Sequence, residues 1–319
     1  MSWRTVVVSS SAKLDYQMGY LVVRNRDVKR VFLNEIETLM IESTAVSLTT
    51  ALLTELVKHK VRVVFCDEKR NPFSEVQPYY GSHDTSVKIR NQIKWDENIK
   101  KAVWTEIVTE KLRQQAAFLR EKSKNIEAEM LDQYITEITF GDETNREGHA
   151  AKVYFNALFG NEFTRSQDNA VNAALNYGYS LILSSINREI TNNGYLTQLG
   201  LSHDNMFNPF NLGSDLMEPF RPLIDRRVIE LQPDKFEHEE KVFMLTVLQG
   251  QVSINDRAEY LDNAIKIYCK SVFDAINDND VSLIKFYHDQ MIKEVYRFLL
   301  YRIYSLHSLV KLFFRHNQL

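Results

Sequence analysis

Three segments that lie far apart in the sequence carry the side chains best suited to chemistry. Glu147, His203 and Glu218 together offer two carboxylates and one imidazole. This donor set contains no thiolate, so it suits Mg²⁺ or Mn²⁺ better than structural zinc. A bound ion of this kind can polarise a phosphoryl oxygen and activate a hydroxyl for in-line attack. Spacing alone does not establish that the three side chains converge.

Glu147 lies near the start of a predicted helix, where its pattern has two interpretations. Thr144 followed three residues later by Glu147 matches a capping box, in which the glutamate bonds back to the N-cap backbone. However, Glu147 also shares a helical face with Ala150 and Tyr154, and a carboxylate beside a buried apolar face needs a compensating partner. His149 points about 200° away from Glu147 on a regular helix, so it does not compete for the same site.

The other two segments also have structural interpretations. His203 lies among turn residues, where a histidine is commonly a surface or hydrogen-bonding residue. Asp215 and Glu218 share a face if helical, or they are acids in the first turns of a helix capped by Ser214. Pro219 is incompatible with a regular helix interior, so a local kink could turn a carboxylate inward.

Further polar side chains are suited to sugar–phosphate contacts. Asn172, Asn176 and Tyr179 lie on one helical face and predict either such contacts or a buried polar network. Two clusters of basic residues are interspersed with acids, which favours solvated helix faces over DNA contacts. These clusters are Lys88, Arg90, Lys94, Lys100 and Lys101, and Lys111, Arg113, Arg120, Lys122 and Lys124.

The elements that must position these side chains fall into two predicted domains. Residues 1–80 contain short β-branched runs, at 3–9, 20–24, 30–33, 38–41 and 61–66, and one helix near 47–59. From residue 81 helical spacing dominates, with helices expected near 89–107, 126–134, 145–159, 168–192, 239–250, 256–276 and 281–316. The predicted class is α+β: a small β-rich, sandwich-like N-terminal domain (1–80), then a larger all-α catalytic domain (81–319) with an extended C-terminal helix.

Composition limits the class of protein. The 319 residues are 44% hydrophobic, which is enough for a sizeable core. Cys66 and Cys269 are too far apart for a CxxC pair, and neither a signal peptide nor a long uncharged apolar run occurs. We therefore expect a cytoplasmic protein without a membrane span. A net charge of −3 neither indicates nor excludes nucleic-acid binding, which needs only a local basic patch.

Four segments resemble a known family. NREGHAAKVYF (145–155), NYGY (176–179), HDNMFNPFNL (203–212) and DLMEPFR (215–221) resemble CRISPR-associated adaptation integrases, which insert new spacers into a CRISPR array, in their type II form. The order of the motifs and of the two domains is also similar. The resemblance covers roughly residues 1–280.

The resemblance implies a site and a reaction. The metal ligands of the family fall on Glu147, His203 and Glu218, with Mg²⁺ or Mn²⁺ as the cofactor. Three further positions lie near the active centre in the family: Asp215, Tyr154 and Asn176. The nucleophile is the 3′-hydroxyl of an incoming DNA fragment, which attacks a phosphodiester at the edge of a repeat without ATP, so the protein supplies positioning and charge stabilisation.

The resemblance also implies partners. Members of the family form homodimers through their N-terminal domains. Two dimers flank a small second adaptation protein of ferredoxin-like fold, giving a heterohexamer that binds double-stranded DNA of fragment and repeat. In type II systems the large RNA-guided nuclease also takes part in fragment selection.

Two other functions stay open on the residues alone. A structure-selective endonuclease for branched DNA would use the same ions with water as the nucleophile. A DNA-binding scaffold without catalysis would not need an intact set of three ligands. The segment after about residue 280 extends beyond the usual end of the family. It predicts an amphipathic helix that packs on the domain or a dimer mate, contacts DNA, or lies on a membrane surface.

Overall fold

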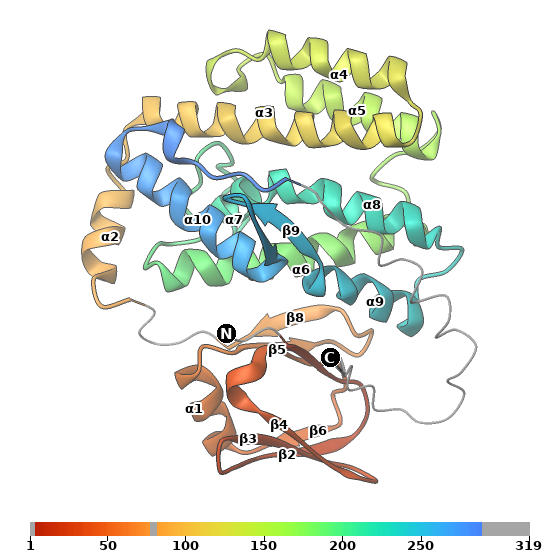
Figure 1. Ribbon diagram of the computed structural model, residues 1–319, viewed down its shortest axis with the longest axis vertical. Coiled ribbons are helices and arrows are strands. Elements are labelled where there is room, and N and C mark those ends of the chain that lie inside the picture. Colours follow the sequence, from red (N-terminus) through yellow and green to blue (C-terminus); the bar gives the residue numbers. More distant parts are fainter. Residues whose placement is uncertain (1–3, 77–81, 289–319) are drawn as a thin grey trace. The chain divides into compact units, whose positions relative to one another are not determined.

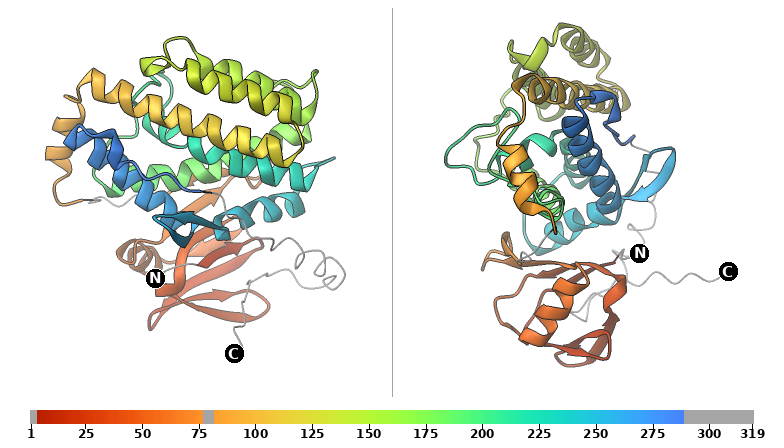
Figure 2. Two further views of the ribbon diagram at one scale, coloured as in Figure 1. Left: turned by 45° about the horizontal axis from the view of Figure 1, so that its top comes forward. Right: turned by 90° about the vertical axis from the view of Figure 1, so that its left-hand side faces the viewer.

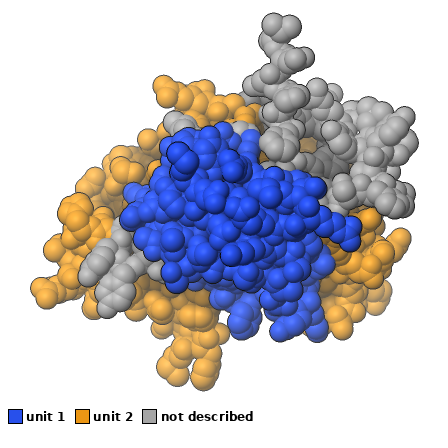
Figure 3. All heavy atoms as spheres, turned by 90° about the horizontal axis from the view of Figure 1, so that it is seen from below, with its two compact units in different colours: residues 1–79, 290–319 blue, residues 80–289 orange. Residues whose placement is uncertain are grey.

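The computed structural model describes residues 4–76 and 82–288 of the chain, which form two compact units (Figure 3). The first unit is rich in strands and the second is mainly helical (Figure 1). In neither described range is any helix long and apolar enough to cross a membrane.

Two sheets build the N-terminal unit. One has the strand order β1–β5–β7–β8: β1 (Arg4–Val8), β5 (Ile36–Ile41), β7 (Arg62–Cys66) and β8 (Pro72–Glu75). The other has the order β4–β3–β2–β6: β4 (Val28–Phe32), β3 (Tyr20–Arg24), β2 (Ala12–Gln17) and β6 (Val46–Leu48). The first three strands of the first sheet are parallel, whereas β2, β3 and β4 are antiparallel.

The core of this unit joins both sheets and one helix. Helix α1 (Thr50–Lys58) begins after Thr49, whose hydroxyl accepts a hydrogen bond from the amide of Leu52 at 3.3 Å. Leu52 packs in one buried cluster with Leu14 of β2, Leu39 of β5 and Val63 of β7. Apolar side chains of both sheets therefore share one core, as in a sandwich.

The second unit consists mainly of nine α-helices over residues 82–288: α2 (Thr85–Gln92), α3 (Glu97–Glu121), α4 (Asn125–Glu137), α5 (Arg146–Phe159), α6 (Ala170–Asn192), α7 (Asn211–Leu216), α8 (Arg221–Leu231), α9 (His238–Leu245) and α10 (Leu261–Asp278). A hairpin of β9 (Gln251–Ile254) and β10 (Arg257–Tyr260) precedes α10. Short 3₁₀ turns include Glu218–Phe220, between α7 and α8.

Helix α3 runs through the centre of this unit. It contacts α4 and α5, and also α8 and α10. Figure 2 shows the helical unit from two further sides. Helix α6 packs against α8, α9 and α10. Gly178 permits the close approach of α6 to α8, because a Cβ atom there would clash with the side chain of Ile224. Helix α3 therefore contacts both α5, which carries Glu147, and the turn Glu218–Phe220 before α8.

The structure confirms the predicted class: strands in the N-terminal unit and helices after them. Sequence analysis missed β2, β6, β8 and the β9–β10 hairpin. The hairpin turns at Asn255 and Asp256, which both have positive φ, whereas a helix was expected from residue 256. The predicted helix over 281–316 is wrong for 284–288, where the chain is not helical and His288 forms an isolated β-bridge with Ser253. Residues 289–319, the rest of that predicted helix, lie outside the described residues.

Candidate active site

Glu147 lies in the first turn of α5, and other groups cap this helix. Asn145 is the N-cap, in a left-handed conformation (φ 53°), and its side chain accepts from the amide of Gly148 at 3.2 Å. The carboxylate of Asp142 accepts from the amide of Glu147 at 3.0 Å. The capping box of Thr144 and Glu147 is therefore wrong, and the Glu147 side chain is available for a different partner.

That partner is Lys111 of α3. Its ammonium donates hydrogen bonds to the carboxylates of both Glu147 and Glu218, the latter at 2.5 Å. The Lys111 side chain is only 6% exposed, so its assignment to a solvated helix face is wrong. Arg221 donates from Nε to the second carboxylate oxygen of Glu218 at 2.8 Å. Two acids from distant segments therefore meet two cations at one buried place.

The kink at Pro219 carries Glu218 into this cluster. Glu218 and Pro219 belong to a 3₁₀ turn, and both are buried. Helix α7 already begins at Asn211, so Ser214 is not the N-cap that sequence analysis considered. Pro219 is tolerated because it lies in the first positions of the turn, where its missing N–H is not needed. The expected inward turn of a carboxylate is confirmed for Glu218.

Charge compensation controls the ionisation of the cluster. Burial alone would raise the pKa of Glu218, but the charges of Arg221 and Lys111 outweigh it and lower that pKa. Burial would likewise lower the pKa of Lys111, but the carboxylates of Glu218 and Glu147 raise it. Both effects favour the ionised forms of Glu218 and Lys111, which pair with each other.

His203 is held by Asp215 and not by the acids of the cluster. Asp215 is fully buried, and its carboxylate accepts from the amides of Leu201, Ser202 and His203 at 2.6, 3.2 and 3.1 Å. The same carboxylate lies 2.6 Å from His203 Nδ1. Gly200 leaves the room for this loop, because a Cβ there would clash with the His203 carbonyl. Asp215 therefore fixes both the loop and the imidazole.

The imidazole of His203 interacts with the charge of Glu218. Its hydrogen bond to Asp215 raises the pKa of His203; burial opposes this, and the charges of Asp215 and Glu218 add to it. The ring packs edge-on against Trp104 of α3, at 5.7 Å between centroids. With Nδ1 bound to a carboxylate, Nε2 is the nitrogen left for a ligand.

The three predicted ligands are only partly brought together. Glu147 and Glu218 share one ammonium, and His203 interacts with Glu218 through its charge. Over residues 4–76 and 82–288, however, no three His, Cys, Asp or Glu side chains are grouped closely enough to hold a metal ion. Their chemistry nevertheless fits a hard divalent cation. Two carboxylates already surround one positive charge, and a histidine with Nδ1 on a carboxylate matches the usual support of metal-binding histidines.

Tyr154 lies beside a second buried carboxylate, Asp225 of α8. The Tyr179 hydroxyl donates to Asp225, and the Tyr154 hydroxyl interacts with the same carboxylate. Burial raises the pKa of Asp225 to about 6, against the opposing effects of both tyrosines and of Arg221. Tyr154 is thus connected to the cluster through Asp225 and Arg221.

Asn172 and Asn176 both receive hydrogen bonds from one guanidinium. Arg165 donates to both amide oxygens, at 2.6 Å for Asn176, and lies over the ring of Tyr179 at 5.4 Å. Asn172 is buried and donates to the carbonyl of Thr164 at 2.9 Å, which confirms the buried network for this residue. Asn176 is exposed.

Sequence analysis missed four residues of the site: Lys111, Arg221, Asp225 and Trp104. The sequence did contain a signal for Lys111. It lies one turn after Ile107 and two turns after Trp104, on the same face of α3. Both of those residues are buried, so a lysine in their stripe needs a buried partner. Arg221 follows Glu218 by three residues, the spacing of a local ion pair, whereas Asp225 carries no comparable signal.

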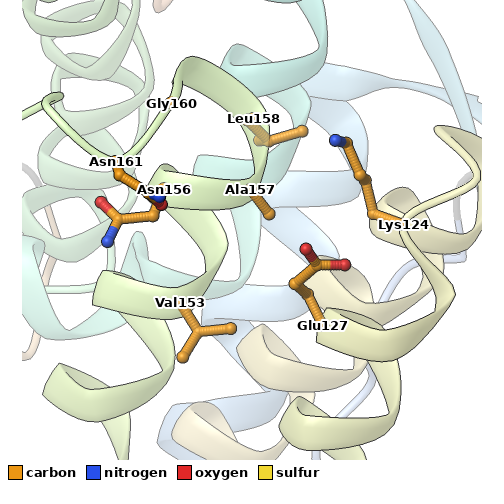
Figure 4. Close-up of a pocket in the computed structure, with 8 residues that line it drawn as sticks. All are labelled: Lys124, Glu127, Val153, Asn156, Ala157, Leu158, Gly160 and Asn161. Carbon is orange, nitrogen blue, oxygen red and sulfur yellow. The ribbon is translucent and has the colours of Figure 1, made fainter.

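A polar hollow elsewhere is separate from this site. It has a volume of about 580 Å³ and lies between the start of α4 and the end of α5 (Figure 4). Lys124 and Glu127 face Asn156 and Asn161 across it. It contains none of the predicted ligands, so the presence of a pocket does not by itself locate the candidate active site.

Comparisons with known proteins agree with one another. The family model for CRISPR associated protein Cas1 matches residues 5–255. A "CRISPR-associated endonuclease Cas1" from Neisseria meningitidis serogroup C (strain 8013) is 38% identical over 232 residues, which is 72% of this chain and 76% of that protein.

Two solved structures have a similar fold. A casposase bound to integration product has a TM-score of 0.71 and 16% identity, over 95% of this chain and 99% of that one. A Cas6-RT-Cas1–Cas2 complex has a TM-score of 0.68 and 18% identity, over 91% of this chain. The present chain spans 36% of that longer chain. At these identities the likeness establishes the fold.

Proposed function

The chain belongs to the family of CRISPR-associated Cas1 proteins, and from that premise we propose that it is a DNA integrase of spacer acquisition. It would insert short DNA fragments into a CRISPR repeat array. The observation that carries this proposal is the meeting of Glu147 and Glu218 at one buried cation, with His203 oriented beside them by Asp215.

The proposed reaction is a transesterification. The 3′-hydroxyl oxygen of the incoming fragment attacks the phosphorus at the edge of a repeat and forms a new phosphodiester bond. The bond to the 3′ oxygen of the repeat strand breaks, and that oxygen leaves as a hydroxyl. One phosphodiester replaces another, so no ATP is needed, and the same site can reverse the step.

We propose that Glu147, His203 and Glu218 hold Mg²⁺ or Mn²⁺. Such an ion, when bound, would polarise the phosphoryl oxygen and favour the attacking alkoxide. The chain's own residues position these ligands: Asp215 holds His203 by Nδ1, and Arg221 holds Glu218 by one carboxylate oxygen. The burial of Glu218 keeps water from competing for these contacts.

The proposed partners follow from the family and from the names of the similar structures. One of those is a complex that includes Cas2, and another is bound to an integration product. We propose double-stranded DNA as the substrate and a homodimer formed through residues 1–80. A small second adaptation protein would complete a heterohexamer in the cytoplasm, and the large RNA-guided nuclease would assist in fragment selection.

A strand-transfer assay tests the proposal. Purified protein and the small partner are mixed with a labelled duplex bearing free 3′-hydroxyls, a supercoiled plasmid with leader and repeat, and Mn²⁺ or Mg²⁺. Glu147→Gln should abolish joining of label to plasmid, as should EDTA or blocked 3′ ends. Glu143→Gln is the matched control, because Glu143 is an exposed acid of the same segment that pairs with Lys101.

The products separate the alternatives. Joined, branched products that need metal and free 3′ ends support the integrase. Shortened strands without joining would instead identify an endonuclease, the activity in the name of the Neisseria relative. DNA binding that is unaffected by EDTA, without any joining, would identify a scaffold and contradict the proposal.

A further inference from the structure

The position of Lys111 is not explained by the three predicted ligands. Its ammonium lies between the carboxylates of Glu147 and Glu218, and its side chain is 6% exposed. A buried lysine normally costs stability unless it is paired, and here two acids pair with the same nitrogen. Because both acids are predicted metal ligands, Lys111 stands where their charges would hold an ion.

We propose that Lys111 is an internal counter-cation, which holds the Glu147 and Glu218 carboxylates together until a divalent cation displaces it. This inference rests on the proposed metal site. An ion that binds both carboxylates does so at about 2.0–2.2 Å, shorter than an ammonium–carboxylate hydrogen bond of about 2.7–2.9 Å. The ion and Nζ would therefore occupy overlapping space, so binding of one excludes the other.

Three observations favour a displaceable lysine over a permanent structural ion pair. Glu218 keeps a separate hydrogen bond to Arg221 at 2.8 Å, so it is not left unpaired when Lys111 leaves. Arg221 itself is anchored over the ring of Tyr179, 4.6 Å from its centroid. Glu147 is 28% exposed, which leaves an open side through which an ion can reach the pair.

The charges of the cluster lead to the same conclusion. Lys111 and Arg221 balance Glu147 and Glu218, so a divalent cation added to the intact cluster would leave two excess positive charges in a buried place. Withdrawal of Lys111 removes one of them. A lysine suits this role because its charge is compact and its four-carbon stem is flexible, unlike a planar arginine.

The test measures metal binding and stability, not joining of DNA. Full-length wild type, Lys111→Met and Lys111→Gln are titrated with MnCl₂ by calorimetry and by the electron paramagnetic resonance of free Mn²⁺. Thermal unfolding is followed with EDTA and with saturating MnCl₂. Lys101→Met is the matched control, because Lys101 lies on the same helix and pairs with Glu143 on the exposed surface.

We expect Lys111→Met to bind Mn²⁺ at least about tenfold more tightly than wild type, because the competitor is gone. With EDTA this variant should melt at a lower temperature than wild type, since two carboxylates then repel each other. Mn²⁺ should restore its melting temperature, giving a larger shift than in wild type. Lys101→Met should match wild type in both measurements. Lys111→Gln, which keeps a polar side chain, serves if the methionine variant does not fold.

The outcomes separate this inference from the proposed function. If wild type binds Mn²⁺ and the Lys111 variants bind it equally or more weakly, Lys111 is not a competitor and this inference alone fails. If neither wild type nor any variant binds Mn²⁺, the metal site of the proposed function fails and the inference fails with it. Tighter binding that disappears when Glu147→Gln is added to Lys111→Met supports both.

Discussion

Glu218 and Asp225 are buried carboxylates on adjoining elements, and the protein compensates them in opposite ways. Two cations, Lys111 and Arg221, surround Glu218 and lower its pKa. Asp225 accepts a hydrogen bond from the Tyr179 hydroxyl, and burial raises its pKa to about 6. Neutral donors satisfy hydrogen bonds, but they do not balance the charge that burial makes costly.

This difference separates two roles. A carboxylate that stays ionised at neutral pH can bind a cation, so Glu218 is suited to a metal site. A carboxylate with a pKa near neutrality is suited to a packing network that connects α5, α6 and α8 through Tyr154, Tyr179 and Asp225. Burial alone therefore does not identify a ligand, whereas the charge of the neighbours does.

The largest expected effect concerns catalysis. Glu218→Gln should lower strand transfer by about a thousandfold, because the ligand charge at the reacting phosphate is lost. Asp225→Asn should lower it by no more than about tenfold, since that residue acts through its neighbours. Initial rates of joining at saturating Mn²⁺ measure both. A loss in Asp225→Asn as large as in Glu218→Gln would break the distinction between the two carboxylates.

The second effect concerns stability against pH. The pKa of Asp225 is about 6 in the folded protein and 3.8 ordinarily, so its protonated form favours folding. That contribution is complete below pH 3.8 and is lost as pH rises through about 6. The stability of wild type relative to Asp225→Asn should therefore fall by about 2 kcal/mol between pH 4 and pH 7.

Urea unfolding at several pH values measures this difference. The stability of wild type relative to Glu218→Gln should change with pH in the opposite direction. The lowered pKa of Glu218 means that its contribution is present above its ordinary pKa of 4.5 and is lost as pH falls. If the stability relative to wild type changed with pH in the same way for both variants, the two carboxylates would not differ as described.

A smaller effect tests the donor to Asp225. Tyr179→Phe removes the hydroxyl that donates to the carboxylate and leaves a buried oxygen without that bond. We expect a loss of about 1–3 kcal/mol in the free energy of unfolding at pH 7. Tyr134→Phe is the control, because the half-buried Tyr134 contributes its ring to contacts with His149 and Arg146. A loss in Tyr134→Phe equal to that in Tyr179→Phe would show that the bond to Asp225 adds nothing.

The smallest effect is expected outside both carboxylate sites. Asn176→Ala removes an exposed acceptor of Arg165, so the free energy of unfolding should change by less than about 1 kcal/mol. The same protein is then assayed for strand transfer. A rate loss above about tenfold at unchanged stability would assign Asn176 to DNA contact, one of the two interpretations of its helical face.

Local patterns determined much of this protein. The helical spacing after Asn145 predicted α5, with Tyr154 buried on the same face as Glu147. The proline after Glu218 predicted the break that turns this acid inward. Such features depend on backbone geometry over one or two turns, which neighbouring residues specify directly. The sequence did not predict β9 and β10, because four-residue strands carry too little periodicity to outweigh a nearby helical pattern.

Only the tertiary structure decided the electrostatics of the site. Lys111 is 36 residues from Glu147 and 107 from Glu218, so no local spacing predicts their meeting. Sequence spacing put Asp215 on a face with Glu218, but the fold turns Asp215 to His203 and the backbone amides before it. Charges interact through space and not along the chain, and their strength depends on burial. The sequence therefore determined which acids are present, and the packing of α3 against α5 and the turn before α8 decided what each acid binds.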